Sequence, residues 1–146
     1  MPKENKIRLF FLKLRKRKTY RRRSSSQKSK AEHTLHKTSA LTLVTSRLSH
    51  FASIYKTTHQ IPLTYHRVTI RNQSSRWGSC SRKGNLSFNY RIALLPPELA
   101  DYIIVHELCH LGEFNHSKKF WDLVEKTIPN WPQLRAELKV YNKTLF

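Results

Sequence analysis

The segment from residue 106 to residue 110 reads His-Glu-Leu-Cys-His, and this spacing constrains the chain more than any other feature. On a helix, side chains four residues apart project from the same face, about one turn apart. His106 and His110 can therefore offer two ring nitrogens to one cation, and Glu107 stands beside the first of them. The segment predicts a helix that carries two metal ligands and a general base.

A catalytic zinc ion takes three protein ligands and keeps one position open for water. His116 is the natural third ligand, because Gly112 lets the chain leave the helix and turn back within six residues of His110. Glu113 and Glu125 are the alternatives if His116 is only a surface residue.

Further helices are expected around this segment. The run 96–98, Pro-Pro-Glu, suits the first turn of the metal-binding helix, since proline fits there and an acidic residue favours the helix dipole. Ser117 is a candidate cap for a later helix that ends near Pro129. Pro132 opens the last one.

The preceding part of the chain predicts one helix and a small sheet. Residues 38–56 form an amphipathic helix, whose apolar positions recur at spacings of three and four: Leu41, Val44, Leu48, Phe51 and Tyr55. Residues 64–92 alternate as in a small antiparallel sheet, with a hairpin turn at 83–84 and Leu86, Phe88 and Tyr90 facing inward. The expected fold class is α+β.

Residues 1–30 differ from the rest in charge. The chain has 28 Lys and Arg against 9 Asp and Glu, a net charge of +19, and residues 1–30 hold 13 of the basic residues and one acidic residue. We expect a flexible basic arm here and one compact domain over residues 31–146, with a short strand at most around 7–11. Such an arm can bind a nucleic-acid backbone by counterion release, or it can simply be solvated.

Two cysteines, Cys80 and Cys109, cannot form a disulfide framework, so a reducing compartment and a cytoplasmic location are expected. No apolar run approaches the roughly 18–20 residues that span a bilayer, so no membrane span is expected.

Several separate motifs, in order, closely resemble the YgjP-like metallopeptidase domain, a family of zincin-like hydrolases. They are Arg-Trp-Gly-Ser-Cys at 76–80, Gly-Asn-Leu at 84–86, Pro-Pro-Glu at 96–98, the run 101–108 and Asn-His-Ser-Lys-Lys-Phe-Trp at 115–121. The resemblance covers about residues 60–130. It implies a zincin-like minimal fold: a helix, a short antiparallel sheet, the active-site helix and a helical C-terminus.

By this resemblance His106, His110 and His116 are the zinc ligands and Glu107 is the catalytic base. The implied activity is peptide-bond hydrolysis by a zinc-activated water, with a peptide or protein as substrate. The same chemistry would also serve a metal-dependent nucleotide pyrophosphohydrolase, and Arg76 and Arg91 are candidates for binding substrate or an oxyanion. A solvated or structural role is the alternative for both arginines.

Overall fold

The first element is a single long helix, α1 (Lys3–Thr57), of 55 residues. A computed structural model describes the backbone of residues 3–146 and the side chains of residues 27, 28 and 30–146. The helix is uninterrupted because no glycine or proline occurs within it, and Lys and Arg favour helix. The short strand expected around 7–11 is therefore wrong. The helix also crosses residue 30, where we placed the domain boundary, and that boundary stays a prediction.

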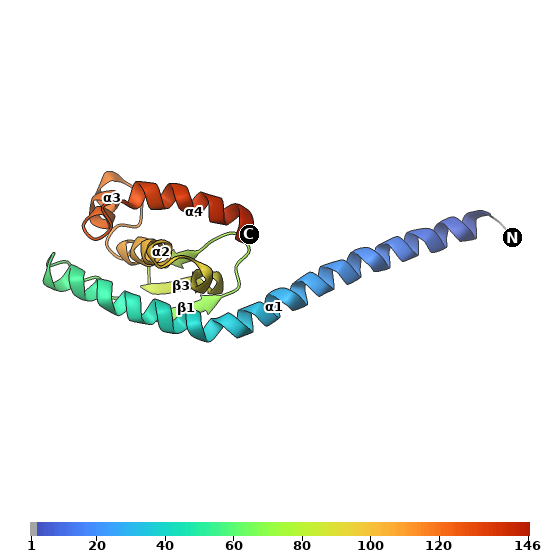
Figure 1. Ribbon diagram of the computed structural model, residues 1–146, viewed down its shortest axis with the longest axis horizontal. Helices are drawn as coiled ribbons and strands as arrows, with labels where there is room; N and C mark the ends of the chain where they lie inside the picture. The colour runs from blue at the N-terminus through green and yellow to red at the C-terminus, as the bar shows by residue number, and fades with distance from the viewer. Residues whose placement is uncertain (1–2) are drawn as a thin grey trace.

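The C-terminal half of α1 packs along the body of the protein, while its N-terminal half extends away from it (Figure 1). The buried face of α1 is made of residues at spacings of three and four: Ala40, Val44, Leu48, Phe51 and Tyr55. The prediction of Leu41 in this face is wrong, because Leu41 is 39% exposed and Ala40 is fully buried. The small side chain of Ala40 allows α1 to lie close to the body of the protein.

Three short strands follow, β1 (Arg67–Arg71), β2 (Gly78–Cys80) and β3 (Asn85–Asn89), in the order β1-β3-β2. The β2–β3 pair is antiparallel, as expected, and Gly84 at φ +75° occupies its turn. The β1–β3 pair is parallel, so the prediction of a wholly antiparallel sheet is wrong. Residues 72–77 carry the chain to the far edge of the sheet, and this crossing lets β3 enter between β1 and β2 in the same direction as β1.

After β3, the short 3-10 helix η1 (Tyr90–Leu94) leads into α2 (Pro97–Cys109). Pro97 occupies the first turn of α2 and Glu98 is its acidic residue, as predicted. Most of α2 is buried, because it lies between α1 and α4 (Figure 1) and also packs on β2. The segment predicted to bind metal thus lies at the end of the central helix.

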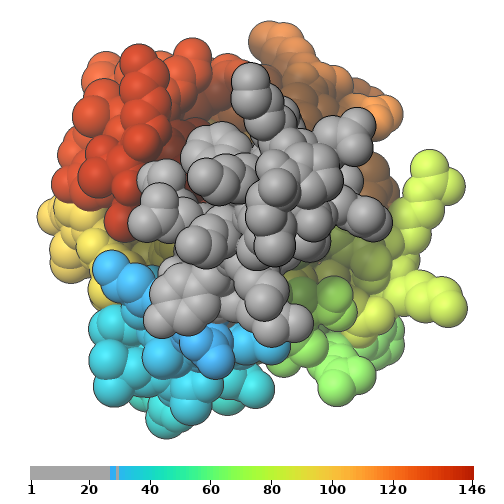
Figure 2. Space-filling model, turned by 90° about the vertical axis from the view of Figure 1, so that its right-hand side faces the viewer, coloured from blue at the N-terminus to red at the C-terminus, as the bar shows by residue number. Residues whose placement is uncertain are grey.

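Two helices complete the chain, α3 (Lys118–Glu125) and α4 (Trp131–Leu145). Figure 2 looks along the long axis and shows α4 and the described part of α1 on opposite sides of the body. Gly112, in the loop before α3, does not have a positive φ. A Cβ atom there would lie 3.2 Å from Leu123 Cδ2 and 3.3 Å from Leu63 Cδ2, so Gly112 favours close packing and does not act as a left-handed helix stop.

Candidate metal centre and active site

The three predicted histidines lie together. His106 and His110 belong to the end of α2, and His116 is returned to them by the loop before α3. One ring nitrogen from each can be chosen so that all lie within 4.8 Å of one another, and Nε2 of His116 is 3.0 Å from Nε2 of His106. Ligands of a tetrahedral zinc ion stand about 3.3 Å apart at Zn–N distances of ~2.0–2.1 Å. The His106–His116 pair is close to this spacing, so the donor set can hold one such metal ion after small movements of the rings.

Two of the histidines are held in the neutral form, which is the form that binds metal. Burial is the main cause that lowers the pKa of His106, to about 3, with smaller effects from His110 and His116. Burial and the neighbouring His110 also lower the pKa of His116. Protonation of one imidazole is disfavoured beside the others, so the rings stay neutral. Neutral rings can bind an external cation together.

The loop and α3 orient the histidines from outside. Nδ1 of His110 lies 3.0 Å from the carbonyl oxygen of Glu113, and as the donor it would leave Nε2 free for a metal. The ring of Phe120 stacks on His110, with centroids 4.5 Å apart. Nδ1 of His106 is buried and has no hydrogen-bond partner among the described residues. The backbone carbonyl of Glu113 thus orients His110. The sequence alone suggested only the Glu113 side chain, as an alternative metal ligand.

Glu107 is buried beside the histidines, with 8% of its surface exposed. It lines a cavity of about 210 Å³ together with His106, Tyr102 and Arg76. Burial raises the pKa of this carboxyl to about 8, and the positive charge of Arg76 opposes that shift. A cation held by the histidines would lower this pKa further, because a nearby opposite charge favours the ionised form.

The two predicted arginines have different surroundings. Arg76 lines the cavity with Glu107, so the structure brings it to the candidate site. Arg91 lies elsewhere: its Nη1 donates to the carbonyl of Gln73 at 3.0 Å, and its guanidinium stacks over Tyr90 and Phe146. These contacts support the structural alternative for Arg91.

Two further residues near the site, Tyr102 and Arg135, were missed in the sequence. Tyr102 precedes His106 by one turn of α2 and lines the same cavity. Arg135, on α4, lowers the pKa of both His106 and His116 through its charge. Its guanidinium lies over Trp121, whose ring stacks on Trp131 at 4.0 Å. Tyr102 appeared in the sequence only within the motif run 101–108, and no local signal placed α4 beside α2.

Cys109 has a structural setting rather than a metal-binding one. It is fully buried, and its Sγ lies 3.1 Å from the hydroxyl of Tyr55, which also donates to the carbonyl of Leu123 at 2.7 Å. Asp101, near the start of α2, receives two hydrogen bonds from Arg47 at 2.6 and 2.7 Å. These contacts fix α2 to α1 and α3, and thereby position the end of α2.

Comparison with known proteins agrees with this geometry. Residues 5–141 match the family described as YgjP-like, metallopeptidase domain. The crystal structure of the metallopeptidase zymogen of Pyrococcus abyssi abylysin is similar, at 28% identity and a TM-score of 0.57, and the similarity covers 67% of this chain and 93% of that one. No curated protein sequence matches this chain.

The fold and the histidine cluster thus define a metal-dependent hydrolase of the metallopeptidase class. The chain belongs to the YgjP-like metallopeptidase family. The predicted family and the α+β fold class are confirmed. Such a peptidase acts on peptides and requires a divalent metal ion. Over residues 3–146, none of the helices has the length and apolar character needed to cross a bilayer.

Proposed function

We propose that this protein is a zinc peptidase in which His106, His110 and His116 hold the metal ion and Glu107 is the general base. The observation that carries the proposal is the convergence of three imidazole nitrogens within 4.8 Å beside a buried carboxylate. All-nitrogen sites with three protein ligands are typical of catalytic zinc. When bound, the metal ion would lower the pKa of a water molecule and polarise a peptide carbonyl.

The role proposed for Glu107 follows from its position. It is adjacent to His106 in sequence and lines the same cavity. The three histidines already supply three protein ligands, so Glu107 is not needed as a fourth. Its carboxylate can accept a proton from water and later deliver it to the leaving amine. Because most of Glu107 is shielded from solvent, a proton taken up there is exchanged with the substrate rather than with bulk water.

Arg76 is proposed to help keep Glu107 ionised. Its positive charge lowers the pKa of Glu107 against the effect of burial. Since Arg76 also lines the cavity, it is available to contact a substrate carbonyl or carboxylate. Arg91 has no part in this proposal.

The direct test compares hydrolysis of casein-derived peptides by the zinc-loaded wild type and Glu107→Gln. We expect a loss of roughly 10²- to 10⁴-fold in kcat, with the metal content unchanged, because the substitution removes the base and leaves the histidines in place. Glu98→Gln is the matched control, since Glu98 is an exposed residue at the opposite end of α2. Hydrolysis of nucleoside triphosphates but not of peptides, abolished by Glu107→Gln, would replace the peptidase assignment by the pyrophosphohydrolase alternative.

Two predictions from the sequence stand beside this proposal. One is a nucleic-acid or other polyanion partner for residues 1–30, whose side chains lie outside the described part of the chain except at 27, 28 and 30. The other is the cytoplasmic location. Deletion of residues 1–30 should abolish salt-dependent DNA binding if the first prediction holds.

A further inference from the structure

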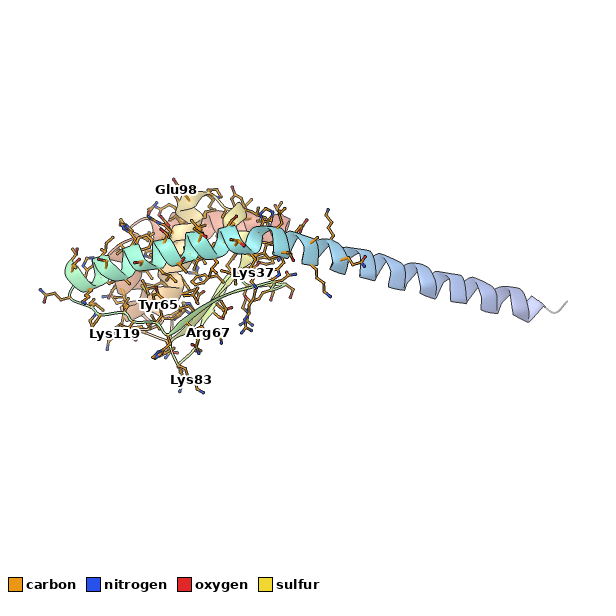
Figure 3. The ribbon with its side chains drawn as sticks, turned by 90° about the horizontal axis from the view of Figure 1, so that it is seen from below. Lys37, Tyr65, Arg67, Lys83, Glu98 and Lys119 are labelled. Carbon is orange, nitrogen blue, oxygen red and sulfur yellow. The ribbon has the colours of Figure 1, made fainter. Side chains whose placement is uncertain are left out.

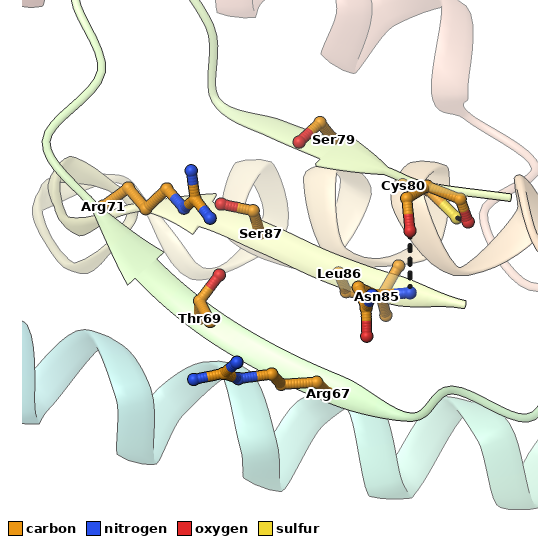
Figure 4. A pocket seen from close by; sticks show the side chains of 9 residues that line it. Arg67, Thr69, Arg71, Ser79, Cys80, Asn85, Leu86 and Ser87 are labelled. Atoms are coloured by element: carbon orange, nitrogen blue, oxygen red, sulfur yellow. Dashed lines mark hydrogen bonds between the residues drawn. The ribbon is translucent and has the colours of Figure 1, made fainter. Parts of the chain in front are cut away.

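A second cavity, of about 360 Å³, lies on the face of the sheet that α1 and α2 leave uncovered. Figure 4 shows α2 behind the sheet, α1 running below β1, and the cavity side chains in front of the sheet. Its lining comes from all three strands: Arg67, Thr69, Arg71, Ser79, Cys80, Ser81, Asn85, Leu86 and Ser87. This cavity shares no residue with the one that contains Glu107.

Three hydroxyl groups form a row across this face. Thr69 of β1 pairs with Ser87 of β3, and Ser87 also pairs with Ser79 of β2. Neighbouring strands are about 4.8 Å apart, so the row presents three hydroxyls over roughly 10 Å. The inward positions of β3 on either side, Leu86 and Phe88, are fully buried, and this alternation places Ser87 on the outer face.

The hydroxyl of Ser87 is the unexplained group in this row. Ser87 is only 9% exposed, and its Oγ is buried without a hydrogen-bond partner among the described residues. A buried hydroxyl without a partner is destabilising. Because this hydroxyl faces a cavity, it is free to pair with a water molecule or with a ligand there.

Two arginines give the cavity its charge. Arg67 and Arg71 lie at the two ends of β1, and Figure 4 shows Arg71 extending across β3 toward Ser87. No acidic side chain lines the cavity, and in the described part of the chain neither arginine forms an ion pair. Figure 3 places Arg67 and Lys83 on one side of the body and the acidic Glu98 on the opposite side. The charge of this lining favours an anionic ligand.

We propose that this face of the sheet binds a phosphate group, held between Arg67 and Arg71 with the Ser87 hydroxyl as an additional donor. A dianionic phosphate matches two guanidinium charges, and its tetrahedral oxygens can accept from donors in several directions, whereas a carboxylate offers two oxygens in one plane. Arg71 is exposed, so its side chain can move to admit the anion to Ser87 while β1 stays fixed.

The cavity is larger than a phosphate ion and falls at the small end of the range for ligand pockets, about 300–1,000 Å³. The phosphate can therefore be free or carried by a small organic molecule. This site is independent of the peptidase proposal, since the side chains proposed to bind phosphate, Arg67, Arg71 and Ser87, lie on the outer face of the sheet. Glu107 instead contacts Gly78, which alternates with Ser79 to the inner face of β2.

The test is a titration of the full-length chain, followed by backbone amide NMR, with inorganic phosphate, glycerol 3-phosphate and acetate at constant ionic strength. We expect saturable shifts centred on the amides of Thr69, Ser79 and Ser87 with phosphate, and none that saturate with acetate. Tighter binding of glycerol 3-phosphate than of inorganic phosphate would identify a phosphorylated molecule as the ligand, and the reverse order would identify the free ion. Both orders support a phosphate site.

Matched variants separate a built site from diffuse positive charge. Arg71→Gln should weaken phosphate binding by roughly tenfold or more, whereas Arg82→Gln removes the same charge from the exposed β2–β3 turn and should change it less than about twofold. Ser87→Ala should weaken binding several-fold without lowering the unfolding temperature, because it removes an unpaired hydroxyl. His110→Ala should leave phosphate binding unchanged, which excludes binding at a metal ion.

Three outcomes would overturn the proposal. They are equal losses from Arg71→Gln and Arg82→Gln, saturable binding of acetate with the affinity of phosphate, and wild-type shifts confined to residues outside the three strands. The last readout needs no variant, so it decides the question even if a substituted chain fails to fold.

Discussion

The side chain of Glu107 packs directly against the backbone of Gly78. A Cβ atom on residue 78 would lie 2.6 Å from Cγ of Glu107 and 2.9 Å from its Oε1. Real Cβ atoms do not approach other atoms so closely, so only glycine at the start of β2 leaves the carboxylate in place. The edge strand and the central helix therefore fix the proposed base between them.

Gly78→Ala should displace the Glu107 carboxylate. The clash involves a side chain rather than backbone, so the fold is expected to persist while kcat for peptide hydrolysis falls by about 10²-fold, the usual effect of a 1 Å misplacement. Zinc content, measured by mass spectrometry, should not change, because the clash at residue 78 involves Glu107 and none of the proposed ligands. Ser74→Ala, an exposed substitution in the preceding loop, serves as the control. Full activity in Gly78→Ala would contradict the proposed role of Glu107.

His116→Ala should reduce zinc affinity by more than about 100-fold, because a coordinating nitrogen is lost outright. Loss of only the hydrogen-bond partner of a ligand costs about 10- to 100-fold. Competition with a chromogenic chelator measures this change. Glu113→Gln and Glu125→Gln test the two alternative ligands from the sequence and should retain zinc, since only the backbone carbonyl of Glu113 contacts His110. Loss of zinc from either Gln variant, but not from His116→Ala, would show that the substituted glutamate is the third ligand in place of His116.

Arg47→Met should lower the free energy of unfolding by about 1 kcal/mol, measured by urea denaturation. The Arg47–Asp101 pair has two short hydrogen bonds and joins α1 to α2, although its side chains are 33% and 20% exposed and solvent weakens the attraction. Lys118→Met is the matched control, because the Lys118–Asp122 pair is 3.8 Å long and 92% and 54% exposed. A change near zero is expected there. Equal effects in the two variants would show that the Arg47 pair has no special contribution.

Tyr55→Phe should lower the free energy of unfolding by about 1–2 kcal/mol. The Tyr55 hydroxyl donates to the carbonyl of Leu123, one of the last four of α3 and thus without a partner inside that helix. Urea denaturation measures the change, and Tyr141→Phe, at a half-buried position on α4, is the control. An unchanged stability in Tyr55→Phe would mean that water replaces the lost bond.

Local spacing in the sequence was sufficient for several parts of the site. The four-residue interval between His106 and His110 placed both on one helix face, because the period of an α-helix is fixed. Gly84 predicted the β2–β3 turn, since that turn needs a positive φ. His116 was also found among the candidates, because few side chains lie within reach of the helix end.

Local spacing failed where the answer depends on contacts between distant segments. The parallel pairing of β1 with β3 follows from the crossing of residues 72–77, and alternation along a strand does not reveal its neighbour. The same holds for Arg91, which packs on Phe146 at the end of the chain, and for Arg135, which α4 brings to the histidines.

The sequence by itself determined the groups on which the proposed chemistry rests: three imidazoles and a carboxylate at fixed intervals, on and just after a helix that local propensity and proline define. Only the tertiary structure decided the surroundings of that chemistry. Burial raises the pKa of Glu107, Gly78 fixes its position, and the row of hydroxyls beside Arg71 exists only because three strands pair in one register. Burial and register are properties of packed segments, and no single segment contains them.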